Sequence, residues 1–241
     1  MKAVGITGYK NSGKTTLLIN LAKELSKRRI QISSVKHVSC KLDLPGTDTT
    51  LHRQHAYQAA AVSDDESAIF FRESLSLEDM LSYMKSDFVL IEGFKSKKTF
   101  PKIVCLKPNE DPHDLLDGLE ICIIGSSINS VDDIKVPVLD KEKDIVMIAD
   151  IAEEKAFKLP DLNCGACGFD TCYELAKQIV SGNRTIQNCK SLYSDIQIKV
   201  KGQVIPVNPF VSKLFRNTIK GMLSALKGFE GGDVEIKIEE E

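Results

Sequence analysis

Short apolar runs alternate with amphipathic stretches along the first 157 residues. Between the runs, leucines recur at helical spacing after residue 16, and further helices are expected at about 48–57, 77–84 and 144–157. This alternation predicts an α/β fold, with a predominantly parallel sheet flanked by helices. The extended runs cover 3–7, 32–37, 59–63, 67–71, 88–94, 102–106, 121–125 and 136–140.

The pattern changes after residue 157. We expect a first domain at 1–157, a four-cysteine module at 158–193 and a small α+β unit at 194–241. In the last unit, two extended runs flank a Lys-Gly turn, and Asn208 followed by Pro209 opens a helix. A further extended run at 234–238 predicts that a hairpin, this helix and a last strand form a three-stranded sheet covered by one helix.

Composition narrows the class of protein. The formal net charge of -2 gives no electrostatic case for nucleic acid as a partner. The apolar runs are far shorter than the roughly 20 residues that cross a bilayer, and no signal peptide is visible, so we expect a cytoplasmic protein without a membrane segment. In a reducing compartment, the seven cysteines indicate metal or redox chemistry in place of disulfides. Cys105 and Cys122 lie in apolar strands and are expected to be inert core residues.

The segment GYKNSGKT, residues 8–15, matches the phosphate-loop pattern G-x-x-x-x-G-K-[ST] between a predicted strand and a predicted helix. Its glycines let backbone N–H groups turn toward phosphates, Lys14 reaches the β and γ phosphates, and the Thr15 hydroxyl ligates Mg²⁺. The context predicts a nucleotide site in a fold like that of P-loop NTPases. The loop residues expected to hold the nucleotide are Gly8, Asn11, Ser12, Gly13, Lys14, Thr15 and Thr16.

A second Mg²⁺ ligand is expected at the end of a neighbouring strand. Glu92 follows four apolar residues, and open α/β sheets bind ligands at the carboxyl ends of their strands. Glu92 and Lys14 are therefore the candidates for any catalytic role. No N-K-x-D guanine-reading motif is present, so the residues by themselves leave the base open.

Five segments within residues 5–104 together resemble the molybdopterin-guanine dinucleotide biosynthesis protein B family: GITGYKNSGKTTL, VKH, LPGTDTTLHR, LIEGFK and KIV. The resemblance implies GTP as the nucleotide, a homodimer, and assistance to a molybdopterin guanylyltransferase, with slow GTP hydrolysis at most. It also places Gly93 in the acidic turn beside Glu92. The family's second signature segment maps onto Lys36, His37, Pro45, Gly46, Asp48 and Arg53. The resemblance implies that Lys36, His37, Asp48, Arg53 and Gly93 help to bind the nucleotide.

The second half of the chain holds the spacing C-x₂-C-x₄-C-x₁₆-C, formed by Cys164, Cys167, Cys172 and Cys189. Four thiolates suit an iron–sulfur cluster or Zn²⁺, with disulfides or free thiols as a third interpretation. Thr171 and Glu174 fit a capping box, so Cys172 is expected in the first turn of a helix. The order of these residues resembles the [4Fe–4S] domain of ion-translocating ferredoxin oxidoreductases and of corrinoid iron–sulfur proteins. That resemblance implies a [4Fe–4S] cluster on the four cysteines.

The two resemblances lead to three functional hypotheses. The preferred one is a GTP-binding accessory protein of molybdenum or tungsten cofactor biosynthesis with an appended cluster. Its partners would be the guanylyltransferase and a molybdoenzyme apoprotein. The second hypothesis is a nucleotide-gated electron-transfer or iron–sulfur delivery protein, and the third is a non-catalytic docking adaptor for a molybdoenzyme.

Overall fold

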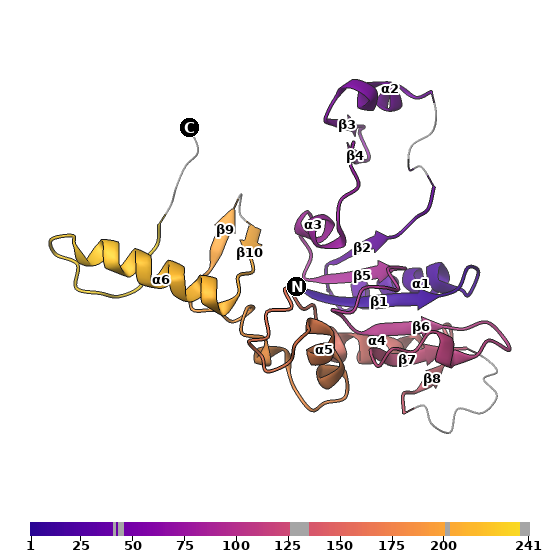
Figure 1. Ribbon diagram of the computed structural model, residues 1–241. Coiled ribbons are helices and arrows are strands. Elements are labelled where there is room, and N and C mark those ends of the chain that lie inside the picture. The colour runs from indigo at the N-terminus through magenta and orange to yellow at the C-terminus, as the bar shows by residue number, and fades with distance from the viewer. Residues whose placement is uncertain (41, 43–45, 126–134, 201–202, 237–241) are drawn as a thin grey trace.

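The computed structural model describes residues 1–40, 42, 46–125, 135–200 and 203–236. Six strands form one parallel sheet: β1 (Lys2–Gly8), β2 (Ile32–Lys36), β5 (Phe88–Glu92), β6 (Lys102–Cys105), β7 (Glu120–Ile124) and β8 (Val138–Leu139). Their order is β2-β5-β1-β6-β7-β8, which places the strand before the phosphate loop inside the sheet (Figure 1). The predicted parallel sheet is confirmed.

Helices cover both faces of this sheet. Helices α1 (Lys14–Lys27) and α4 (Ile145–Lys155) pack on one face, and α3 (Leu77–Ser82) covers part of the other. Side chains of β5 alternate between the two layers: Phe88 and Leu90 pack with α1 and α4, whereas Val89 and Ile91 pack with α3. Because both faces of β5 are buried, its sequence is a continuous apolar run.

A small excursion leaves the sheet between β2 and α3. It consists of α2 (Asp48–His55) and an antiparallel hairpin of β3 (Gln58–Val62) and β4 (Ser67–Phe71). The two extended runs expected here are confirmed as strands, but they pair only with each other. In Figure 1 this excursion stands away from the six-stranded sheet.

The four-cysteine module packs on the first domain. Its helix α5 (Cys172–Val180) begins with the third of the four cysteines, and the short 3₁₀ turn η2 (Ile186–Asn188) precedes the fourth. In the first domain, another 3₁₀ turn, η1 (Pro112–Asp114), precedes β7. The buried residues that join module and domain are Leu119, Phe157, Leu159, Cys172, Leu175, Ala176 and Cys189. The module therefore shares a hydrophobic cluster with the sheet-bearing domain.

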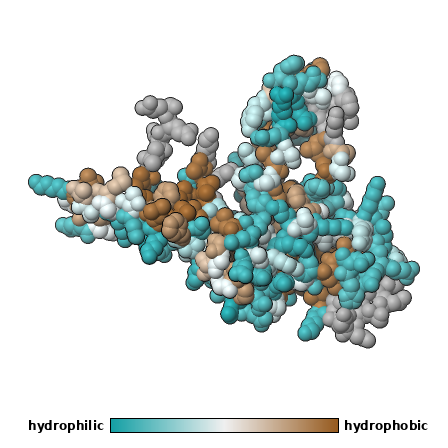
Figure 2. Space-filling model, viewed as in Figure 1, coloured by the Kyte–Doolittle hydropathy of each residue, from teal (hydrophilic) through white to brown (hydrophobic). Residues whose placement is uncertain are grey.

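The C-terminal unit consists of an antiparallel hairpin, β9 (Ile198–Val200) and β10 (Gln203–Ile205), and helix α6 (Pro209–Ser224). The predicted last strand is wrong within the described residues, since 234–236 lie outside any strand. Each hairpin strand is only three residues long and offers few backbone groups to a further strand. Apolar side chains gather on the surface of this unit (Figure 2), among them the exposed Phe210 and Met222.

No helix in the described part of the chain is long and apolar enough to cross a membrane.

Candidate nucleotide and cluster sites

The phosphate loop joins the carboxyl end of β1 to the first turn of α1. At Gly8, φ is 146°, and a Cβ built there would lie 2.3 Å from the Cys105 carbonyl oxygen and 2.5 Å from Ser12 Oγ. Gly13 caps α1 with a φ of 84°, a conformation that glycine adopts without strain. The backbone of the loop therefore requires both glycines of the pattern, and the positive end of α1 follows them directly.

Side chains of the loop are arranged around its backbone. Lys14 Nζ donates to the Tyr9 carbonyl oxygen at 2.5 Å, which folds the lysine back over the loop. Ser12 Oγ is buried and has no hydrogen-bond partner among the described residues. Such an orphaned hydroxyl, beside a helix N-terminus capped only by glycine, fits a loop that binds phosphate oxygens.

Glu92 lies beside the loop because β5 and β1 are neighbours. Its buried carboxylate accepts from Thr15 Oγ1, which is 3.1 Å from both carboxylate oxygens. Lys36 Nζ, from the end of β2, lies 3.0 Å from Glu92 Oε1 and 3.2 Å from Thr15 Oγ1. The predicted pair of oxygen ligands and one residue of the second signature segment thus meet at one sheet edge. A hydroxyl and a carboxylate are ligands that suit Mg²⁺.

The turn after Glu92 also brings His37 to this edge. The His37 backbone N–H donates to the Glu92 carbonyl oxygen at 2.9 Å, and its ring meets Phe94 edge-on with a centroid distance of 5.1 Å. Gly93 has a φ of 89°, and a Cβ there would lie 3.1 Å from His37 Cβ. The close approach of the two segments therefore favours glycine at this position.

A pocket of about 240 Å³ extends from the phosphate loop across the carboxyl ends of β6, β7 and β8. Asn11, Ser12 and Gly13 form its wall on the loop side, and Lys107, Pro108, Asp140 and Lys141 are among the residues opposite. Its volume approaches the lower limit of about 300 Å³ typical for small-molecule sites. The opposite residues carry no motif and were not predicted from the sequence. Their only signal is that they follow apolar strands.

The rest of the second signature segment lies elsewhere. Asp48 is in the first turn of α2, and the Arg53 guanidinium lies 5.2 Å from the centre of the Phe70 ring. Both belong to the excursion that stands away from the sheet (Figure 1), so the structure does not bring them to the phosphate loop. Gly46 precedes this helix with a φ of 84°, and Pro45 lies outside the described residues. A nucleotide-binding role for Asp48 and Arg53 stays a prediction.

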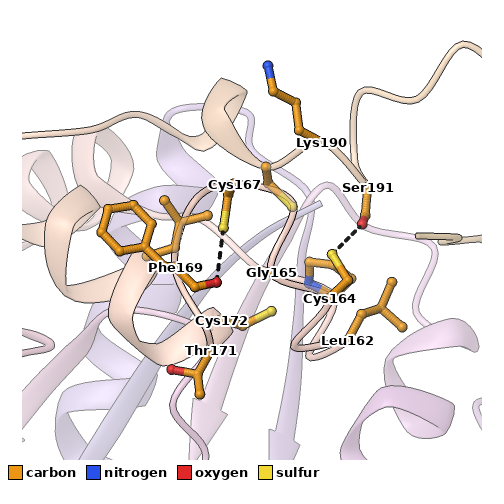
Figure 3. Close-up of a pocket in the computed structure, with 12 residues that line it drawn as sticks. Leu162, Cys164, Gly165, Cys167, Phe169, Thr171, Cys172, Lys190 and Ser191 are labelled. Carbon is orange, nitrogen blue, oxygen red and sulfur yellow. Dashed lines mark hydrogen bonds between the residues drawn. The ribbon is translucent and has the colours of Figure 1, made fainter. Parts of the chain in front are cut away.

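The four predicted cysteine ligands line one cavity. Figure 3 shows the sulfur atoms of Cys164, Cys167 and Cys172 around the same space. The described residues contain no group of three or more His, Cys, Asp or Glu side chains arranged to hold a single metal ion. Four thiols around one cavity are a donor set that suits an iron–sulfur cluster or Zn²⁺.

Local sequence explains how Cys172 is held. The predicted capping box is confirmed: the Thr171 side chain accepts from the Glu174 N–H, and the Glu174 carboxylate accepts from the Thr171 N–H. The Cys172 N–H donates to Asn163 Oδ1 at 2.7 Å, which ties the first turn of α5 to the residue before Cys164. Burial raises the pKa of the Cys172 thiol. Cys172 is therefore held at the positive end of a helix, a position that suits a ligand of an anionic cluster.

The outer cysteine and the two core cysteines have different surroundings. Cys164 is exposed, and its sulfur lies 3.3 Å from the hydroxyl oxygen of Ser191. Burial raises the pKa of Cys105 and of Cys122 to about 12, so both thiols stay protonated. The prediction that these two are buried core residues is confirmed.

Comparison with known proteins decides the family. The family model "Molybdopterin guanine dinucleotide synthesis protein B" (MobB) matches residues 3–124. The "Putative molybdopterin-guanine dinucleotide biosynthesis adapter protein" of Methanocaldococcus jannaschii is 34% identical over 247 residues, covering 99% of this chain and 97% of that protein. The chain belongs to the MobB family.

The four-cysteine module is a second part of this MobB family member. The model "Putative Fe-S cluster" matches residues 159–191, a range that contains all four cysteines. One component of the ion-translocating oxidoreductase complex of Rhodobacter capsulatus is 30% identical over 88 residues, or 32% of this chain and 47% of that protein. The crystal structure of Bacillus subtilis MobB has a TM-score of 0.54 at 21% identity and covers 65% of this chain and 99% of that one. This likeness shows a MobB-like fold, with about a third of the present chain outside it.

Proposed function

We propose that this MobB family member is a GTP·Mg²⁺-binding adapter in molybdopterin guanine dinucleotide biosynthesis whose four-cysteine module holds a [4Fe–4S] cluster. The nucleotide-binding part of this proposal rests on the contacts among Thr15, Glu92 and Lys36 beside the phosphate loop. The names of its relatives, which are adapter proteins of this biosynthesis, support the choice of a guanine nucleotide.

The residues of the loop have separable tasks in this proposal. Loop N–H groups and Lys14 bind the phosphate chain, for which Lys14 exchanges the Tyr9 carbonyl oxygen for a phosphate oxygen. Thr15 and Glu92 hold Mg²⁺, which supplies charge neutralisation for the phosphates when bound. The pocket at the ends of β6, β7 and β8 takes the nucleoside. We expect slow GTP hydrolysis at most, as the resemblance to the family implies.

The chain acts as an adapter in this proposal, by presenting a bound nucleotide to another protein. We expect a homodimer that works in the cytoplasm with a molybdopterin guanylyltransferase and delivers to a molybdoenzyme apoprotein. Cys164, Cys167, Cys172 and Cys189 hold the cluster, and the module supplies a redox centre to this assembly. The four thiols around one space and the match of this segment to an Fe–S model support this half.

The nucleotide half is tested by thermal unfolding of the full chain with GTP and Mg²⁺. GTP at about 100 times its Kd is expected to stabilise the wild type by about 2.7 kcal/mol. Lys14→Ala should lose this stabilisation. Lys10→Ala, which removes an exposed lysine from the same loop, should keep it. Equal stabilisation of Lys14→Ala and the wild type would contradict the assignment, and stronger stabilisation by ATP than by GTP would contradict the base.

The cluster half is tested by anaerobic purification followed by iron, sulfide, zinc and pterin analysis. About four iron and four sulfide per chain are expected. Cys172→Ser should lose them, whereas Cys122→Ser, a matched change in the core of the sheet, should not. One zinc without sulfide would exclude the cluster. Co-purified pterin would favour the adapter, and nucleotide-dependent cluster transfer without pterin would favour iron–sulfur delivery.

A further inference from the structure

The segment from Glu92 to Lys102, here called the linking segment, runs from the nucleotide site to the four-cysteine module. Strand β5 ends with Glu92 at the edge of the sheet where α1 begins. Strand β6 begins with Lys102, which pairs with Gly5 in the middle of β1, one position before Ile6, the partner of Glu92. Figure 1 shows α5 on the side of the sheet from which β6 starts. The segment therefore leaves and re-enters the sheet at nearly the same level, and between these two points it contacts both the phosphate loop and the chain that leads into the module.

The first part of the linking segment contacts the nucleotide site. Besides the Glu92 carboxylate at Thr15, the Gly93 N–H donates to the Ile6 carbonyl oxygen of β1 at 3.0 Å. The Lys95 ammonium lies 4.0 Å from the centre of the Tyr9 ring. Tyr9 is the loop residue whose carbonyl oxygen holds Lys14. A ligand that rearranges the phosphate loop therefore acts on this part of the segment.

The second part contacts the approach to the cysteines. Lys97 Nζ lies 3.2 Å from the Asp161 carboxylate, three positions before Cys164 in the chain. The Thr99 carbonyl oxygen accepts from the Leu159 N–H at 2.8 Å. The Lys98 ammonium pairs with Asp117 and lies 5.3 Å from the centre of the Tyr173 ring. The segment is thus bonded to the chain that leads into the cysteine cavity.

A buried lysine holds the two parts together. Lys102 is 2% exposed, and its Nζ donates to the Lys95 carbonyl oxygen at 2.9 Å and to the Asp117 carboxylate at 2.5 Å. The Asp117 carbonyl oxygen in turn accepts from the Tyr173 hydroxyl at 2.5 Å. Tyr173 follows the cluster ligand Cys172 in the first turn of α5. Since a buried ammonium is costly to leave without its partners, movement at Lys95 cannot be independent of Asp117.

We propose that nucleotide binding at the phosphate loop and cluster loading in the four-cysteine module are reciprocally coupled through the linking segment and the Lys102–Asp117–Tyr173 contacts. This inference rests on the proposed function. We expect a positive sign, because one conformation of the segment makes the contacts at both ends, so a ligand that stabilises this conformation at one site also favours it at the other. Because such coupling is reciprocal, the bound cluster lowers the Kd for GTP by the same factor by which bound GTP lowers the Kd for the cluster.

The experiment uses the full chain with and without the reconstituted cluster. The GTP·Mg²⁺ Kd is measured by calorimetry in both forms, and iron release to a chelator is followed with and without GTP. At the lower end of typical coupling factors, the cluster is expected to lower the GTP Kd about fivefold. GTP is expected to slow iron release. No GTP binding in either form would refute the proposed function and this inference with it, whereas equal binding in both forms would refute the coupling alone.

Two variants test the route. Tyr173→Phe removes the hydroxyl that donates to Asp117 and keeps the ring, and it should reduce the coupling factor to below about twofold while GTP binding of the cluster-free chain stays unchanged. Tyr193→Phe removes an exposed hydroxyl from the same module and should keep the full factor. If Tyr173→Phe fails to fold by circular dichroism, Lys98→Met, which removes one ion pair to Asp117, takes its place. Wild-type coupling in the folded variant would overturn the proposed route.

Discussion

Replacing Gly8 by alanine tests how tightly the sheet constrains the phosphate loop. The new Cβ would lie 2.3 Å from the Cys105 carbonyl oxygen and 2.5 Å from Ser12 Oγ. Ser12 has a side chain that can rotate. The Cys105 carbonyl belongs to β6, which is paired with β1 at this level of the sheet, so it cannot retreat without breaking the ladder. The φ of 146° adds a second cost, because side chains rarely adopt it.

Two terms give the expected magnitude. Overpacking costs about 1–3 kcal/mol, and a side chain at a glycine-only conformation costs about 1–3 kcal/mol. We therefore expect Gly8→Ala to lower the free energy of unfolding by about 4 kcal/mol, or the Tm by roughly 8–16 °C at this chain length. The matched control is Gly182→Ala. Gly182 has a φ of 79° with nothing within 4 Å of a built Cβ, so only a conformational cost of about 1 kcal/mol is expected there.

Urea unfolding of both variants, followed by far-UV circular dichroism because the chain has no tryptophan, measures the difference. GTP binding to Gly8→Ala at low temperature should also be lost, since the loop N–H groups are displaced. A Gly8→Ala variant within about 1 kcal/mol of Gly182→Ala would refute the reasoning. It would mean that the β1–β6 pairing yields at the loop and that the glycine is not required by the backbone.

Two further outcomes test the packing of the module and the state of the core thiols. Leu175 lies in the buried cluster between the module and the first domain, so Leu175→Ala should lower the free energy of unfolding by about 3 kcal/mol in urea titration. The control, Leu226→Ala at a 60% exposed position, should change it by at most about 0.5 kcal/mol. Iodoacetamide at pH 8 should modify the exposed Cys40 and spare Cys105 and Cys122, because a pKa of about 12 leaves on the order of 1 in 10,000 of each core thiol ionised. Peptide mass spectrometry of the cluster-free protein reads the result, and equal rates at Cys122 and Cys40 would contradict it.

Local chemistry explains which parts of the site could be predicted from sequence. The phosphate loop, Glu92 and the Thr171 cap each depend on a short spacing or on the end of an apolar run, and the structure places all three as expected. The pocket at the ends of β6, β7 and β8 could not be predicted, because Lys107 and Asp140 belong to no sequence motif of defined spacing. Only the order of the strands brings those residues to the loop, and this order is set by tertiary packing.

The excursion between β2 and α3 shows a second limit. Its extended runs are strands, as expected, but the run at 67–71 carries exposed and half-buried side chains and pairs only with the run at 58–62. A strand that is buried on both faces, such as β5, has a continuous apolar sequence. The sequences of β3 and β4, QAAAV and SAIFF, also contain four consecutive apolar residues each, so they do not reveal that these strands lie outside the main sheet, and with them Asp48 and Arg53.

Lys102 illustrates why the connection between the two sites could not be predicted at all. In the sequence it is a single charged residue at the start of an apolar run, a position that usually faces solvent at the end of a strand. Its burial depends on Asp117, which lies 15 positions further along the chain, and Asp117 is in turn joined to Tyr173 over 56 positions. No local pattern records contacts at these separations. Burying the Lys102 ammonium costs free energy, even with two acceptors from the protein. Packing of the sheet alone would not require a lysine at this position. This cost is the physical reason for proposing that Lys102 couples the nucleotide site to the cluster site.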